Sequence, residues 1–196
     1  MGDGWQRDNL TLRPAECVAL DGVNGRHVEV ELLVRPGSAP APGSDGDPSH
    51  DVLALVVPAA PPHTNGYLLS ADADAAQGAI VAISLDTHET LVAVGDGPPD
   101  PQWLRRSEAK ARRAACKPGP DGAMHVRVFL DGSCLEVFSG ATGQVLTRRV
   151  YRSWGAAGAD AGQGPAPRLS VHNWAWGDVT LVRARVWDME GAFPDR

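Results

Sequence analysis

The chain has 196 residues, a length that fits one domain, and its 43% hydrophobic content is enough for a core. A formal net charge of −6 at pH 7 argues against a nucleic-acid or anionic-membrane partner. No apolar stretch approaches the roughly 18 residues that a membrane span needs, and the first ten residues lack the apolar core of a signal peptide. With 22 glycines and 16 prolines, the chain is expected to have many turns and few long helices.

The first half of the chain predicts several strands separated by loops. Val28–Val34 alternates apolar and acidic residues, as expected of a strand with one wet face. The segment 35–51 is rich in Pro, Gly, Ser and Asp, so we expect a flexible loop there. Three further segments follow with strand character: Val52–Val57, Gly66–Ser70, and a hairpin of Ala79–Leu85 with Thr90–Val94.

The only helix-like segment is Leu104–Cys116, in which Glu108 and Arg112 stand at the i,i+4 spacing. Residues 103–116 are therefore the candidate for a short helical insertion. Their basic character is more typical of a solvated helix than of a binding patch.

The run from His125 to Tyr151 carries the strongest local signals. Apolar residues alternate up to Asp131, and Asp-Gly at 131–132 is typical of a tight hairpin turn. A returning strand around Leu135 and a second turn at 139–143 lead into Val145–Val150. These signals predict a three-stranded antiparallel meander.

After a second loop at 155–167, Leu169–Trp174 and Val179–Trp187 are expected to close the fold as strands. Many short strands, little helix and frequent Gly/Pro turns favour an all-β antiparallel β-sandwich, jelly-roll-like and built of two sheets. We expect residues 1–196 to form this one domain.

The sequence contains no recognisable metal or cofactor motif. Cys17, Cys116 and Cys134 have no zinc-type spacing, and either one disulfide with a free thiol or three reduced thiols fits them. The six histidines stand singly, without an HExxH, a GxSxG elbow or a phosphate-cradling Gly loop. We therefore expect no metal site and no cofactor.

The meander resembles a signature of the C-terminal β-sandwich of glycoside hydrolase family 32, which includes invertases, inulinases, levanases and fructan exohydrolases. The ending Val186-Trp187-Asp188-Met189 with Phe193 is similar to that domain's last strand. The residues that carry the signature, expected to be structural, are Asp131, Ser133, Glu136, Phe138, Thr147, Arg149, Val150 and Tyr151.

The resemblance implies that catalysis belongs to a preceding five-bladed β-propeller, whose carboxylates lie in Asn-Asp-Pro-Asn, Arg-Asp-Pro and Glu-Cys motifs. This sequence has no Asn-Asp-Pro, its Arg7-Asp8 is followed by Asn9, and its Glu16-Cys17 lies too close to Arg7. We therefore expect no catalytic residue here. The expected partner is a catalytic propeller, outside this sequence or on a partner chain, and the parent activity would be hydrolysis of fructosyl bonds in sucrose or fructans.

Asp131 and Glu136 flank a hairpin, and a retaining glycosidase needs two carboxyl groups about 5 Å apart. The favoured interpretation is structural: Asp131 sets the turn, and Glu136 pairs with Arg127, Arg148 or Arg149 on neighbouring strands.

Trp174 and Trp176 have the i,i+2 spacing that places two residues on one strand face, with Trp154 and Trp187 as candidate neighbours. They fit a sandwich core, a domain interface, or an aromatic platform that binds fructan or another glycan. A stand-alone carbohydrate-binding module is therefore the alternative function. A third interpretation is a gene product that lacks its catalytic region.

Overall fold

The computed structural model describes residues 4–20, 27–37, 51–57, 77–96, 100–131, 133–150 and 169–189. The expectations for Gly66–Ser70, for the loop at 155–167, and for Tyr151 and Trp154 fall outside these ranges.

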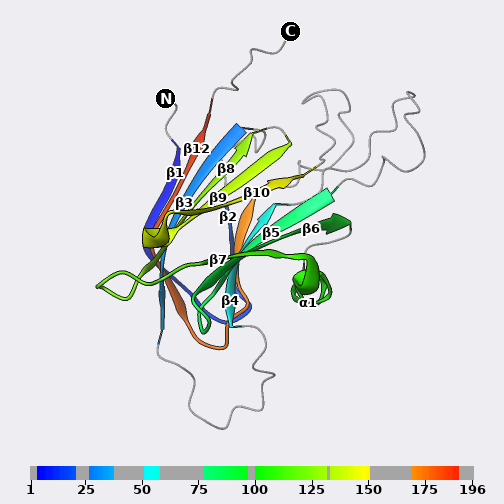
Figure 1. Cartoon of the computed structure of the whole chain (residues 1–196). Coiled ribbons are helices and arrows are strands. Elements are labelled where there is room, and N and C mark those ends of the chain that lie inside the picture. The colour runs from blue at the N-terminus through cyan, green and yellow to red at the C-terminus, as the bar shows by residue number, and fades with distance from the viewer. Residues whose placement is uncertain are drawn as a thin grey trace, which may run out of the picture.

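In the described ranges, twelve strands form two antiparallel sheets that lie face to face, as Figure 1 shows. Sheet A has the order β1 (Trp5–Leu12), β12 (Val179–Asp188), β3 (His27–Pro36), β8 (Met124–Asp131), β9 (Cys134–Ser139) and β10 (Gln144–Arg149). Sheet B has the order β2 (Cys17–Ala19), β11 (Ser170–Asn173), β4 (Val52–Val57), β5 (Gln77–Ser84), β6 (Glu89–Asp96) and β7 (Arg112–Ala115). The predicted all-β sandwich is confirmed.

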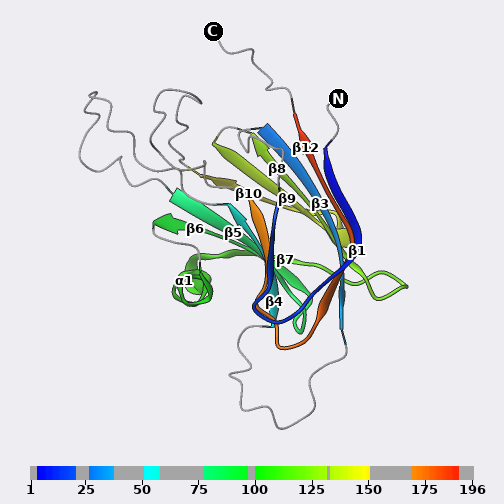
Figure 2. The ribbon, with the colours of Figure 1, turned by 180° about the vertical axis from the view of Figure 1, so that it is seen from behind.

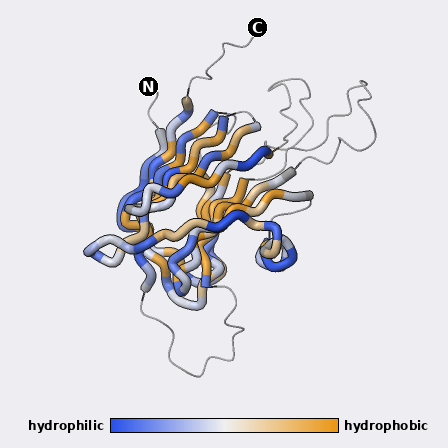
Figure 3. The backbone as a smooth tube through the Cα atoms, viewed as in Figure 1, coloured by the Kyte–Doolittle hydropathy of each residue, from blue (hydrophilic) through white to orange (hydrophobic). Residues whose placement is uncertain are grey.

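The main core lies between the sheets and follows from strand alternation. In β3, every second residue from Val28 to Val34 is buried, while Glu29 and Glu31 face outward. Inward residues of sheet B, such as Leu55 and Val81, complete the same cluster. Figure 3 shows hydrophobic positions, in orange, along the strands of both sheets.

A second apolar cluster covers the outer face of sheet B. Ile80 of β5 and Ala93 of β6 pack there with Trp103 and Leu104 of helix α1 (Pro101–Ser107), which lies beside β6 in Figure 2. Gly95 lets the indole approach, because a Cβ at this position would lie 3.0 Å from a ring carbon of Trp103. This second layer explains why β4 is buried on both faces.

The expected helix at Leu104–Cys116 is wrong over most of its length. Helix α1 ends at Ser107, one 3₁₀ turn covers Glu108–Lys110, and the chain then forms β7 at the edge of sheet B. Strand β7 pairs with β6 and buries Ala114, so sheet pairing overrides the local helical spacing.

The N-terminal strands β1 and β2 were not predicted. Both are edge strands whose residues are mostly exposed, so their sequences lack an apolar alternation. The loop expected at 35–51 also begins later than predicted. Arg35 and Pro36 belong to β3, where they pair with Thr180 and Val179.

The predicted meander is confirmed as β8, β9 and β10. Asp131 pairs with Cys134, so a two-residue connection joins β8 to β9. The second turn is a 3₁₀ turn at Gly140–Thr142 that ends at Gly143, whose φ of 64° suits a residue without a Cβ.

A buried hydroxyl pair joins the two sheets at the turn end of β9. Ser139 donates to the Ala115 carbonyl at 2.8 Å, so Thr90 of β6 is the donor in its 2.9 Å bond with Ser139. Both side chains are completely buried. The pair therefore supplies an inter-sheet hydrogen bond that no solvent molecule replaces.

We expect Ser139→Ala to cost about 2 kcal/mol of unfolding free energy, because it leaves the Thr90 hydroxyl buried without its acceptor. Thr90→Val should cost less, about 1 kcal/mol, and should offset part of the loss when combined with Ser139→Ala. Urea unfolding of the double-mutant cycle measures this coupling. Strictly additive costs would contradict the inter-sheet bond.

Among the described residues, no helix is both long and apolar enough to cross a bilayer.

Candidate functional site

The outward residues of sheet A form two parallel rows across four strands. Antiparallel register places them opposite one another on β3, β8, β9 and β10. One row is Glu29, Phe129, Glu136 and Thr147, and the next is Glu31, Arg127, Phe138 and Val145. Three of the signature residues (Glu136, Phe138 and Thr147) therefore stand in these two rows, outside the core.

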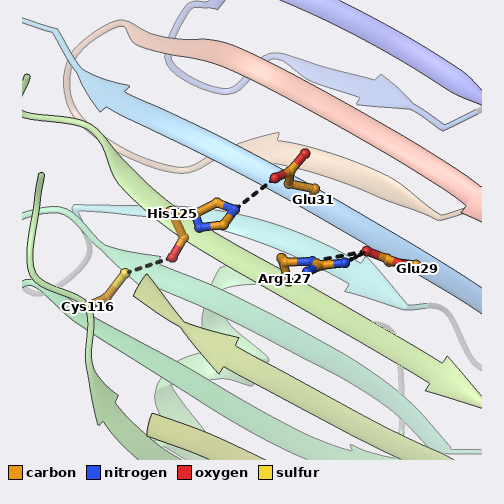
Figure 4. Close-up of polar contacts among 5 residues, drawn as sticks. All are labelled: Glu29, Glu31, Cys116, His125 and Arg127. Atoms are coloured by element: carbon orange, nitrogen blue, oxygen red, sulfur yellow. Dashed lines mark hydrogen bonds and ion pairs between the residues drawn. The ribbon is translucent and has the colours of Figure 1, made fainter. Parts of the chain in front are cut away.

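An Arg–Glu ion pair and a His–Glu hydrogen bond, each diagonal across β3 and β8, occupy the β3 side of the face, as Figure 4 shows. Arg127 donates to Glu29, with its Nε 3.0 Å from Oε1, and His125 Nε2 lies 3.0 Å from Glu31 Oε1. Both carboxylates are largely buried, whereas His125 and Arg127 are more exposed. Both carboxylates on this side therefore have partners within the sheet itself.

The β9–β10 side of the same face exposes two apolar side chains beside the polar Glu136 and Thr147. Phe138 is 38% exposed and Val145, directly opposite it on β10, is 46% exposed. Phe129 meets Phe138 edge to face, with ring centroids 5.4 Å apart, and Arg127 lies over Phe129. We call Phe129, Phe138 and Val145 the Phe138 patch.

Asp131 and Glu136 lie on the same face, but their surroundings differ. The Asp131 carboxylate contacts the His27 imidazole on β3, which directs it away from Glu136 on β9. The expected partners of Glu136 have other contacts. Arg127 binds Glu29, Arg148 donates to the Lys110 carbonyl at 3.3 Å, and Arg149 donates to the Ser133 hydroxyl at 2.8 Å.

Two further signature residues hold the hairpin ends together. The Val150 N–H donates to the Ser133 carbonyl at 2.9 Å, and the Val150 side chain is completely buried. Together with the bond from Arg149, this fixes the end of β10 against the β8–β9 connection.

The two tryptophans proposed as a sugar platform follow β11, which ends at Asn173. Trp174 is half-buried against the cluster on the outer face of sheet B, and its ring lies 5.7 Å from the His172 ring. Burial also lowers the pKa of His172 below its ordinary value. Trp176 is 40% exposed, so it is the member of the pair that offers a free ring surface.

An acidic pair lies beside Trp176. Burial raises the pKa of the Asp51 carboxyl; a hydrogen bond from the Trp176 backbone N–H partly offsets this, and the nearby Asp86 carboxylate raises it further. Asp86 in turn accepts a 2.6 Å hydrogen bond from Ser84. Within the residues that the structure describes, no group of three or more His, Cys, Asp or Glu side chains could hold a metal ion.

Because the pKa of Asp51 is raised in the folded protein, the folded chain holds the Asp51 proton more tightly than the unfolded chain does. This proton binding stabilises the fold at low pH, and the stabilisation is lost as pH rises through the folded pKa. We expect Asp51→Asn, which keeps the acceptor for Trp176, to flatten that part of the stability–pH profile. At neutral pH the gain should stay below about 1 kcal/mol, because solvent screens the half-exposed carboxyl. Thermal unfolding between pH 3 and 8 measures it, and a variant less stable than the wild type at every pH would contradict the assignment.

The family model described as "Glycosyl hydrolases family 32 C terminal" matches residues 83–188, more than half of the chain. The chain belongs to this family. The matched segment runs from β5 to β12 and contains the whole β8–β10 meander with the signature residues.

Solved structures of family 32 enzymes share the fold. Exo-inulinase from Aspergillus awamori is 17% identical with a TM-score of 0.58, and 96% of this chain covers 29% of that one. Fructofuranosidase from Schwanniomyces occidentalis is 8% identical with a TM-score of 0.59, covering 94% and 33% of the two chains. Fructan 1-exohydrolase IIa from Cichorium intybus is 15% identical with a TM-score of 0.54, covering 97% and 36%.

The chain thus spans about a third of the length of the solved structures it matches. A search of the curated proteins gave no match. This chain is a family 32 C-terminal β-sandwich module, and the sequence resemblance is confirmed.

Sequence reasoning identified Asp131, Glu136 and Phe138 but missed their surroundings. His27 lies 104 residues before its partner Asp131, and Glu29 lies 98 residues before its partner Arg127. No local sequence pattern therefore links them to the meander. The one available signal was the outward position of Glu29 and Glu31 in an alternating strand.

Proposed function

We propose that this β-sandwich is the accessory module of a β-fructofuranosidase-type enzyme and that it packs against and stabilises a catalytic propeller. The hydrolysis of fructosyl bonds in sucrose or fructans belongs, in this proposal, to the propeller. The proposal rests on the family match and on the small share of each related enzyme that this chain covers. The whole sandwich aligns, yet it accounts for about a third of enzymes described as an inulinase, a fructofuranosidase and a fructan exohydrolase.

The positions of Asp131 and Glu136 support the assignment of catalysis to the propeller. A glycosidase pair must face the scissile bond together, with one carboxyl group as proton donor. Here the Asp131 carboxylate contacts His27 of β3, and β3 and the β9 strand that carries Glu136 lie on opposite sides of β8. In this proposal neither carboxylate is a catalytic residue.

The test is an assay of the purified chain on sucrose, inulin and levan. We expect no hydrolysis above that of a heat-denatured control. Turnover by the wild type that is abolished in Asp131→Asn or Glu136→Gln would overturn the proposal, because it would place the chemistry on this sandwich.

The exposure of Trp176 favours a second, independent role in sugar binding. An exposed indole offers the apolar surface on which a sugar ring stacks, and Trp176 is one of three exposed large hydrophobic side chains among the described residues. Titration of inulin and levan against the wild type and Trp176→Ala tests this role. Equal binding, or none, by the two proteins would exclude it.

A further inference from the structure

The two outer faces of the sandwich differ in what covers them. On sheet B, the chain supplies its own cover, because Trp103 and Leu104 of α1 bury the apolar side chains of β5 and β6. On sheet A, no described segment lies over the strands, and the Phe138 patch is open to solvent. Two of the three exposed large hydrophobic side chains in the described residues, Phe138 and Val145, are neighbours on this one face.

We propose that the Phe138 patch, with Glu136 and Thr147 beside it, is the surface through which this module docks on its catalytic propeller. This inference rests on the proposed function and adds to it the docking face. The patch has the composition of an interface centre, since aromatic residues are enriched there. Its neighbours Glu29, Glu31, His125 and Arg127 are already paired within sheet A and form a polar rim.

The register places the exposed apolar residues together on adjacent strands. Phe138 of β9 lies directly opposite Val145 of β10, and Glu136 lies opposite Thr147 in the next row. Phe138 and Val145 are both exposed although they are apolar, which is typical of a surface that another protein covers.

The relatives indicate what that contact is. Their chains are about three times as long as the part that this sandwich covers. The remainder of such an enzyme is the nearest surface available to an outer face of this module. A second copy of the chain and a glycan are the competing occupants, and the experiment below separates them from the propeller.

The experiment measures binding of the chain to a purified family 32 catalytic propeller, by isothermal titration calorimetry of the two proteins. Phe138→Asp and Val145→Asp should each weaken binding at least tenfold, since each places a charge in the centre of the contact. Gln102→Asp is the control: it introduces the same charge at an exposed position of α1, outside sheet A, and affinity should stay within twofold.

Phe138 and Val145 are exposed, so the two variants are expected to keep the thermal midpoint of the free chain, which the same samples report. Wild-type binding with no loss in the patch variants would overturn the docking face and leave the proposed function standing. Absence of wild-type binding would overturn the proposed function itself. A dimer that dissociates in Phe138→Asp, or fructan binding lost in that variant, would assign the patch to the competing occupant and contradict the inference.

Discussion

Asn173→Ala is expected to lower the unfolding free energy by about 3 kcal/mol, because it leaves several buried backbone groups without partners. The Asn173 side chain is completely buried at the end of β11. Its Nδ2 donates to the carbonyls of Leu12 and Gly177 at 2.8 and 2.9 Å, and its Oδ1 accepts from the Ala175 N–H at 2.9 Å. The bond to Leu12 joins sheet B to the end of β1 in sheet A.

Urea or thermal unfolding measures the loss, which corresponds to a thermal midpoint lower by roughly 10 °C. Asn173→Asp keeps the acceptor for Ala175 but turns a carboxylate toward two carbonyl oxygens, so its destabilisation should be larger at pH 7 than at pH 4. Gln6→Ala removes an exposed amide and should change stability by less than about 0.5 kcal/mol. A loss below about 1 kcal/mol in Asn173→Ala would contradict this role.

Trp103→Ala is expected to cost about 3–5 kcal/mol, the usual range for removing a buried tryptophan. Trp103 is 6% exposed and is the largest side chain between α1 and sheet B. Its loss leaves a cavity over Gly95 and uncovers apolar residues such as Ile80 and Ala93. The variant should therefore also bind more of a hydrophobic dye than the wild type.

Circular dichroism is the suitable probe for this unfolding experiment, because the substitution removes one of six fluorescent tryptophans. Gln102→Ala, at the exposed preceding position of α1, is the matched control and should leave stability almost unchanged. Equal stabilities of Trp103→Ala and Gln102→Ala would show that α1 does not cover sheet B.

The sequence predicted the strands in which apolar residues alternate with polar ones, because this alternation separates buried from exposed side chains. The alternation in Val28–Val34 and in the meander reflects one buried and one wet face, and the structure confirms both. Strand β1 has no such alternation, because it lies at the edge of sheet A with most of its side chains exposed. Its pairing with β12 joins residues more than 160 positions apart in the sequence, which no local pattern reveals.

The residues of the candidate site were predicted only in part, for the same physical reason. The Asp-Gly turn and the strand alternation place Phe138 and Val145 on their strands, but their exposure depends on what covers sheet A. Asn173 appeared in the sequence only as one residue of a strand. Its role depends on Leu12, a partner 161 residues away.

The central claim is that this family 32 sandwich acts by stabilising a catalytic propeller. Differential scanning calorimetry of a purified family 32 catalytic propeller, alone and with an excess of this chain, tests the claim most directly. Binding to the folded state alone raises the unfolding temperature by mass action, about 2.7 kcal/mol of added stability at a hundredfold excess over the Kd. A higher midpoint for the propeller in the mixture is the predicted result, and two independent transitions at unchanged temperatures would contradict the claim.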